Sequence, residues 1–155
     1  MWYIIFLVVV AVVILYITVS HAPLFRISTS VKKYIRENGL IHFTSMECWE
    51  SISKNGLKGE YSDMGFPETL LGKMVWTYQY IDKSDIEAKH KIVANKKRGK
   101  ENPKRYGICI KITGISEDDL NRLYTRHGFI RDGAIVYRGE WLKVDKVELV
   151  KKWII

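Results

Sequence analysis

The N-terminal part of the chain is one unbroken apolar run. Its first nineteen residues contain no charged residue, no proline and no glycine. A helix rises about 1.5 Å per residue, so a helical run of this length roughly matches the thickness of a bilayer's hydrocarbon core. Trp2, Tyr3 and Tyr16 lie near its two ends, where aromatic rings prefer the level of the lipid headgroups. The pattern predicts a transmembrane anchor over residues 1–22 and a juxtamembrane linker over residues 23–39.

A cleaved signal peptide is the alternative interpretation of the same run. Residues 20–22 (Ser-His-Ala) have the small-residue pattern of a cleavage site, but Pro23 follows at once. No Lys or Arg precedes the run, and it is longer than the usual apolar core of a signal peptide. Basic residues follow it instead: Arg26, Lys32, Lys33 and Arg36. The positive-inside rule then predicts a single-pass membrane protein with the bulk of its chain in the cytoplasm.

Residues 40–155 show a mixed pattern of alternating and helically spaced apolar positions. Strands are expected over 40–43, 73–80, 106–113, 128–130, 134–138 and 147–154, and helices over 29–37, 44–55, 86–96 and 116–124. Thr44 and Glu47 have the spacing of a helix capping box, and Asn55-Gly56 is a typical helix end. Cys48 is expected on the buried face of that helix. The predicted fold is α+β: a transmembrane helix, then a domain of helices and short, mainly antiparallel strands.

Positive charge is concentrated in one part of the chain. The net charge is +8, and nine of the 25 Lys and Arg residues lie within residues 83–105, here called the basic segment. They are Lys83, Lys89, Lys91, Lys96, Lys97, Arg98, Lys100, Lys104 and Arg105. One interpretation is a solvated loop facing anionic lipid, and the other is a contact for nucleic acid or another polyanion. No aromatic residue interrupts the run 95–103, which favours the solvated loop.

Other chemistry-bearing motifs are few. The two cysteines, Cys48 and Cys109, are too few for a disulfide-framed secreted domain, so we expect reduced thiols. His21, His90 and His127 have no metal-ligand spacing among themselves or with the cysteines. The sequence contains no phosphate-binding Walker loop, no dinucleotide fingerprint and no Gly-x-Ser-x-Gly motif.

The segment after the linker carries a family resemblance. Residues 40–45 (Leu-Ile-His-Phe-Thr-Ser), the helix after them and Gly56-Leu57 resemble the opening of ADP-ribosyltransferase-fold domains. Those domains commonly begin with a His-aromatic-Thr strand, a short helix and Gly-Leu. Residues 74–77 (Met-Val-Trp-Thr) look like their second strand, and residues 134–137, 141–144 and 147–150 are similar to the closing strands of the toxin-like and DNA-targeting branches.

The resemblance implies an enzyme that transfers ADP-ribose from NAD. The reaction passes through an oxocarbenium-like state, so the site must hold NAD bent and stabilise positive charge. By resemblance, His42 would bind a ribose hydroxyl, and Trp76 or Tyr78 would stack on the nicotinamide. The backbone at Thr44 is a further candidate contact for NAD. Each of these four residues also has a purely structural interpretation: a strand histidine at position 42, a helix cap at 44, and core packing at 76 and 78.

The family's catalytic carboxylate has no direct counterpart in this sequence. That carboxylate usually orients the second ribose hydroxyl and polarises the nucleophile. The aligned position falls on Ala134 or Ile135, and the flanking Asp132 and Glu140 are the nearby substitutes, although both also suit turns. The family's second-strand tyrosine is likewise replaced, by Val or by a shifted Trp.

Two functions therefore remain open. The first is a membrane-anchored, cytoplasmic ADP-ribosyltransferase-like enzyme that uses NAD and an unknown acceptor. The second is a non-catalytic, membrane-tethered module that binds nucleic acid, anionic lipid or a protein through the basic segment. The missing glutamate favours the module. The His-Phe-Thr opening and the aromatic strand favour the enzyme.

Overall fold

The structure, a computed structural model, describes residues 2–61, 68–126 and 133–154. The helices are α1 (Trp2–His21), α2 (Thr29–Asn38), α3 (Trp49–Asn55), α4 (Lys83–Ala94), α5 (Lys97–Glu101) and α6 (Glu117–Leu120). Short 3-10 turns are η1 (Met46–Cys48), η2 (Glu68–Leu71) and η3 (Pro103–Tyr106). The strands are β1 (Phe25–Arg26), β2 (Leu40–Thr44), β3 (Leu57–Lys58), β4 (Met74–Gln79), β5 (Ile108–Thr113), β6 (Leu123–Thr125), β7 (Ala134–Arg138), β8 (Trp141–Leu142) and β9 (Lys146–Lys152).

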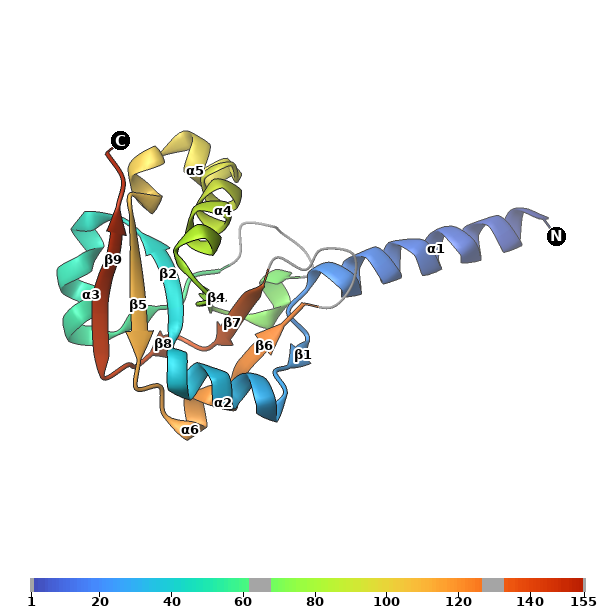
Figure 1. The fold of residues 1–155 in the computed structure, drawn as a ribbon. Coiled ribbons are helices and arrows are strands. Elements are labelled where there is room, and N and C mark those ends of the chain that lie inside the picture. The colour runs from blue at the N-terminus through green and yellow to red at the C-terminus, as the bar shows by residue number, and fades with distance from the viewer. Residues whose placement is uncertain (1, 62–67, 127–132, 155) are drawn as a thin grey trace.

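The strands form a seven-stranded sheet in the order β1-β6-β7-β4-β2-β5-β9 and a two-stranded sheet of β3 and β8 (Figure 1). Every pairing between these strands is antiparallel. The α+β class with antiparallel strands, which the sequence predicted for the body of the chain, is confirmed.

The two central strands of the large sheet pair only at one end. β2 and β4 are in register at Leu40↔Gln79 and Ile41↔Tyr78. Beyond that point β2 continues along β5, up to Thr44, while β4 continues along β7. The sheet therefore forks between β2 and β4, and backbone and side chains in the fork are not covered by a neighbouring strand.

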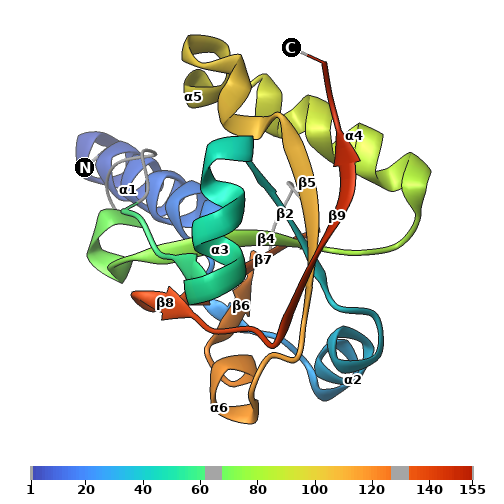
Figure 2. The same cartoon turned by 90° about the vertical axis from the view of Figure 1, so that its left-hand side faces the viewer.

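Apolar side chains fill both faces of the sheet. Because neighbouring residues of a strand point to opposite faces, Leu40 and Ile41 belong to different clusters. The first cluster includes Ile52 of α3, and the second includes Ile86 of α4. Figure 2 shows α3 and α4 on opposite sides of β2 and β5, so the fork lies between two helical layers.

Residues 23–39 join this core directly. β1 pairs with β6, and α2 buries Ile35 against the sheet. Ser28 begins α2, because its side chain accepts a hydrogen bond from the amide of Val31. α2 ends at Gly39, whose φ of 75° suits a residue without a Cβ atom. The segment expected as a linker thus supplies a strand and a helix to the domain.

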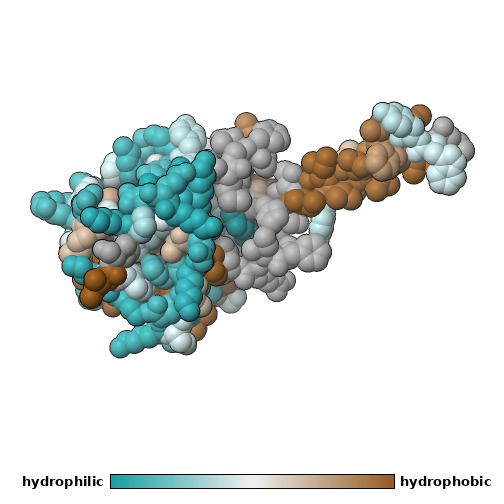
Figure 3. Space-filling view, turned by 90° about the horizontal axis from the view of Figure 1, so that it is seen from above, coloured by the Kyte–Doolittle hydropathy of each residue, from teal (hydrophilic) through white to brown (hydrophobic). Residues whose placement is uncertain are grey.

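The N-terminal helix does not meet the expectation of an anchor. α1 projects from the domain with apolar side chains exposed (Figures 1 and 3). Within the described part of the chain, no helix combines the length and the apolarity needed to cross a membrane. The predicted transmembrane anchor over residues 1–22 and the predicted single-pass localisation are therefore wrong.

Two predicted helix boundaries are also wrong, both because sheet pairing prevails over local signals. Thr44 is the last residue of β2, opposite Ile108, so it does not cap the following helix; that helix begins at Trp49 after η1. Cys48, expected on its buried face, is exposed. The helix expected over 116–124 ends at Leu120, and Leu123 opens β6. The strand expected over 128–130 lies outside the described residues.

Candidate functional site

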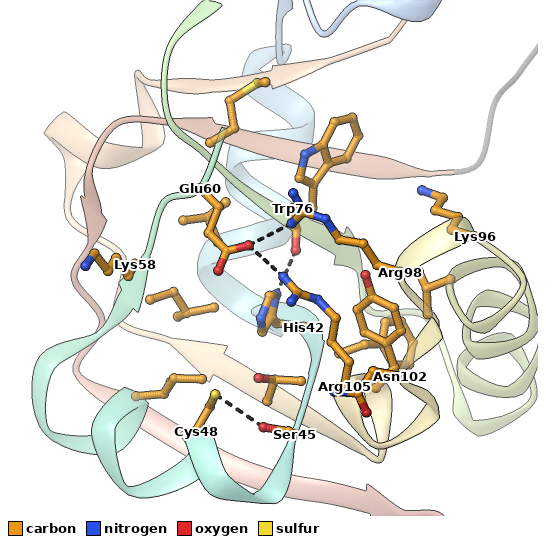
Figure 4. Close-up of a pocket in the computed structure, with 18 of the residues that line it drawn as sticks. His42, Ser45, Cys48, Lys58, Glu60, Trp76, Lys96, Arg98, Asn102 and Arg105 are labelled. Carbon is orange, nitrogen blue, oxygen red and sulfur yellow. Dashed lines mark hydrogen bonds and ion pairs between the residues drawn. The ribbon is translucent and has the colours of Figure 1, made fainter. Parts of the chain in front are cut away.

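A pocket of about 760 Å³ opens at the fork between β2 and β4. Its lining comes from the end of β2, from η1 and α3, from the segment after β3, from β4, and from the basic segment (Figure 4). Ile52 of the first cluster and Val93 of the second both line it, so the pocket reaches both faces of the sheet. Its volume lies within the range typical of small-molecule sites.

His42 lies in this pocket in a defined protonation state. Its Nδ1 atom is 2.7 Å from the carbonyl oxygen of Trp76, and because a carbonyl can only accept, Nδ1 carries the proton. Burial lowers the pKa of His42 below the usual 6.5, and the backbone bond to Trp76 only partly opposes this. The ring is therefore neutral at pH 7, and Nε2 is a hydrogen-bond acceptor.

The two aromatic candidates on β4 have different surroundings, although both line the pocket. Tyr78 is 2 % exposed and packs edge-on against Phe43 at a centroid distance of 5.7 Å, so its ring belongs to the core. Trp76 is half-buried, with the guanidinium of Arg126 4.4 Å and Nζ of Lys96 5.4 Å from its ring. Trp76 is therefore the aromatic side chain that meets charged groups of the pocket.

The other predicted site residues are placed as follows. Thr44 is buried and lines the pocket beside His42. Glu140 lies outside the pocket, where it accepts a 2.6 Å hydrogen bond from Nζ of Lys73. Asp132 lies outside the described residues. The fork thus brings together His42, Thr44, Trp76 and Tyr78, but not Glu140.

Sequence reasoning missed Glu60, one of two glutamates among the described residues of the pocket lining; the other is Glu47. Glu60 lies after β3, and its backbone exchanges two hydrogen bonds of 3.0 and 2.9 Å with Met74 at the start of β4. Its Oε2 atom accepts hydrogen bonds from Arg98 at 2.9 Å and from Arg105 at 2.6 Å. No sequence signal after Lys58 indicates this placement; the bridge to β4 determines it.

The basic segment folds as one wall of the pocket instead of the expected solvated loop. α5 and η3 follow α4 closely. Gly99 permits the approach of α5, because a Cβ atom at this position would lie only 2.5 Å from the carbonyl oxygen of Ala94. Five of its nine cations line the pocket: Lys96, Lys97, Arg98, Lys104 and Arg105. Lys89 is buried, forms an ion pair with Asp85 and donates to the carbonyl of Gln79 at 2.7 Å. The remaining three, Lys83, Lys91 and Lys100, are exposed outside the pocket.

The charge of the lining favours an anionic ligand. Among the described residues, two glutamates and seven cationic side chains line the pocket; the cations are Lys58, Lys96, Lys97, Arg98, Lys104, Arg105 and Arg126. In a concave site with low-dielectric walls, such an excess raises the local concentration of anions. The pocket therefore combines a neutral histidine, a tryptophan and a strongly positive wall.

Cys48 provides a reporter for this pocket, since it lines the rim and is exposed. Cys109 is buried, and burial raises the pKa of its thiol to about 12. Because the thiolate is the reactive form, a maleimide should modify Cys48 alone in the folded chain and both cysteines after denaturation. Mass spectrometry of the labelled chain measures this directly. Two adducts before unfolding would contradict the burial of Cys109, and Cys48→Ser should abolish labelling of the folded protein.

Comparisons with family models, with curated proteins and with solved structures gave no match to this chain.

Proposed function

We propose that this chain is an ADP-ribosyltransferase-like enzyme that uses NAD as its substrate. The observation that carries the proposal is the meeting of His42 and Trp76, from two different strands, in a pocket with a cationic wall. These are the two residue types that the sequence resemblance assigns to ribose and nicotinamide. The wall of lysines and arginines suits the two phosphates that join the halves of NAD.

His42 has the chemistry that its proposed role needs. Since its Nδ1 proton is committed to the carbonyl of Trp76, its Nε2 lone pair is the acceptor for a ribose hydroxyl. In the transfer, the bond between ribose C1′ and the nicotinamide nitrogen breaks and nicotinamide leaves with the electron pair. The nucleophilic atom of the acceptor then bonds to C1′, and its proton passes to solvent. A histidine that holds the ribose hydroxyl fixes the sugar in the orientation from which nicotinamide departs.

A second candidate function is binding of a nucleotide-like polyanion without turnover. The residues at the expected carboxylate position favour this alternative. Ala134 and Ile135, one of which aligns with the family's catalytic carboxylate, are apolar and buried, and Glu60 is paired with two arginines. In this alternative the same pocket holds the ligand, and the bond to nicotinamide stays intact.

Titration of the full chain with NAD tests the proposal. A mild nonionic detergent should cover the exposed apolar side chains of α1, since such surfaces aggregate. We expect saturable heat of binding, protection of Cys48 from maleimide, and release of free nicotinamide detected by chromatography. Binding and protection without nicotinamide release would favour the second candidate. If millimolar NAD neither binds to the chain nor protects Cys48, both candidate uses of NAD are excluded.

A further inference from the structure

We propose that Arg98 and Arg105 form a phosphate-binding subsite, and that Glu60 is its internal occupant, displaced when a ligand's diphosphate binds. The inference rests on the proposed function for the ligand class, a diphosphate ester, and it names the residues that receive that group. Figure 4 shows both guanidinium groups directed at the Glu60 carboxylate, next to His42.

The contacts describe a site built for one anionic group. The two arginines come from α5 and η3, and their guanidinium groups converge on the same oxygen, Oε2 of Glu60. Two like charges held so close repel each other unless an anion lies between them. In the present structure the Glu60 carboxylate is that anion, and it keeps both side chains in position.

Burial indicates which member of the cluster can leave. The side chains of Arg98 and Arg105 are 33 % and 38 % exposed, whereas that of Glu60 is 58 % exposed. The backbone of Glu60 is fixed by its two bonds to Met74, so rotation of the side chain is enough to move the carboxylate into solvent. An ion pair with so exposed a partner contributes little to stability, so breaking it costs little.

A phosphate group competes well for the vacated position. Guanidinium groups match phosphate oxygens with paired hydrogen bonds, and a diphosphate offers more charge and more oxygens than one carboxylate. Lys96, Lys97 and Lys104 line the same wall and add to the attraction. The exchange therefore replaces an exposed internal ion pair by contacts that the ligand makes within the pocket.

The test uses inorganic pyrophosphate as the probe and the full chain in the same detergent. Glu60→Gln removes the competing charge and should tighten pyrophosphate binding by about threefold to tenfold, the equivalent of one or two exposed ion pairs. Arg98→Gln and Arg105→Gln should each weaken it by about tenfold or more, as expected for loss of a charge-assisted hydrogen bond. Calorimetry measures the affinities, and protection of Cys48 reports occupancy.

A matched control separates this effect from net charge. Glu140→Gln removes an equally exposed carboxylate, paired with Lys73 outside the pocket, and should leave the affinity nearly unchanged. Equal tightening by both variants, or no tightening by Glu60→Gln, would overturn the proposal. If Glu60→Gln fails to fold, Arg105→Lys still tests the subsite, because it keeps the charge but loses the fork; unchanged affinity there would also overturn it.

The two proposals fail separately in these measurements. Pyrophosphate binding with the expected response of Glu60→Gln, but without binding of NAD, would retain the subsite and reject the proposed function. The opposite outcome is release of nicotinamide from NAD without tighter pyrophosphate binding by the Glu60→Gln variant. That result would retain the proposed function and reject the subsite.

Discussion

Replacement of His42 by alanine should lower the rate of nicotinamide release from NAD by about 100-fold or more while the chain remains folded. The side chain is neutral, and on the proposed function its Nε2 acceptor would hold the ribose hydroxyl in the bound complex. Removal of one positioned hydrogen-bonding group from an active site costs about two to three powers of ten in rate. Chromatographic assay of nicotinamide, with circular dichroism of the variant, measures both effects.

Two further variants distinguish a catalytic role of His42 from a structural one. In His42→Asn the amide can still donate to the carbonyl of Trp76, but the distal acceptor is lost, so activity should stay low and stability should recover. In His42→Gln the longer side chain extends toward the Nε2 position, so part of the activity should return. Full activity in His42→Asn would show that only the bond to Trp76 matters, and the proposed role would be wrong.

The pH dependence follows from the direction of the His42 pKa shift. Because burial lowers that pKa from 6.5, the folded chain keeps the ring neutral below the pH at which the unfolded chain protonates it. Stability is therefore fully present above about pH 6.5 and is lost as the pH falls through the folded-state pKa. Burial also lowers the pKa of His90, which contributes in the same direction. The difference between the wild-type and His42→Asn thermal midpoints, measured from pH 8 to pH 5, isolates His42.

Local signals in the sequence located several elements well. The Asn55-Gly56 pair predicted a helix end, and Gly56 does follow α3 with a φ of 83°. The strand that carries His42 and the aromatic strand that carries Trp76 were also predicted, because apolar and β-branched residues cluster there. These features depend on neighbours within a few residues, which a sequence displays directly.

The pocket itself depends on contacts that no local pattern records. β2 and β4 pair at only two positions, and this early separation creates the fork. Thr44 has the spacing of a helix cap, yet its backbone is placed opposite Ile108 of β5. Glu60 reaches the pocket through its bridge to Met74, which is fourteen residues further along the chain. In each case long-range strand pairing decides the outcome.

The basic segment shows the same dependence on tertiary structure. Its composition is typical of a solvated loop, because aromatic residues are missing from the run 95–103. Gly99 nevertheless allows α5 to approach α4, and this contact turns part of the segment inward. The inward cations and the outward ones have the same residue types, so only the fold distinguishes them.

Simultaneous replacement of Lys96, Lys97 and Arg98 by Glu should weaken binding of NAD and of pyrophosphate by about 100-fold or more, since three charges of the pocket wall are reversed. The change also places glutamate side chains near Glu60, which excludes an anionic ligand further. Calorimetry at about 0.15 M salt measures the affinities.

The matched control reverses Lys83, Lys91 and Lys100, which are exposed and lie outside the pocket. Both triple variants change the net charge of the chain by the same amount. The three side chains of this control are exposed to solvent, where salt at about 0.15 M screens charge over about 8 Å, so affinity should change by less than about threefold. Equal weakening in the two variants would show that anions respond to the overall charge of the chain, and the cationic wall would lose its assigned role. A large loss confined to the first variant requires that ligand phosphates lie against α5, beside His42 and Trp76.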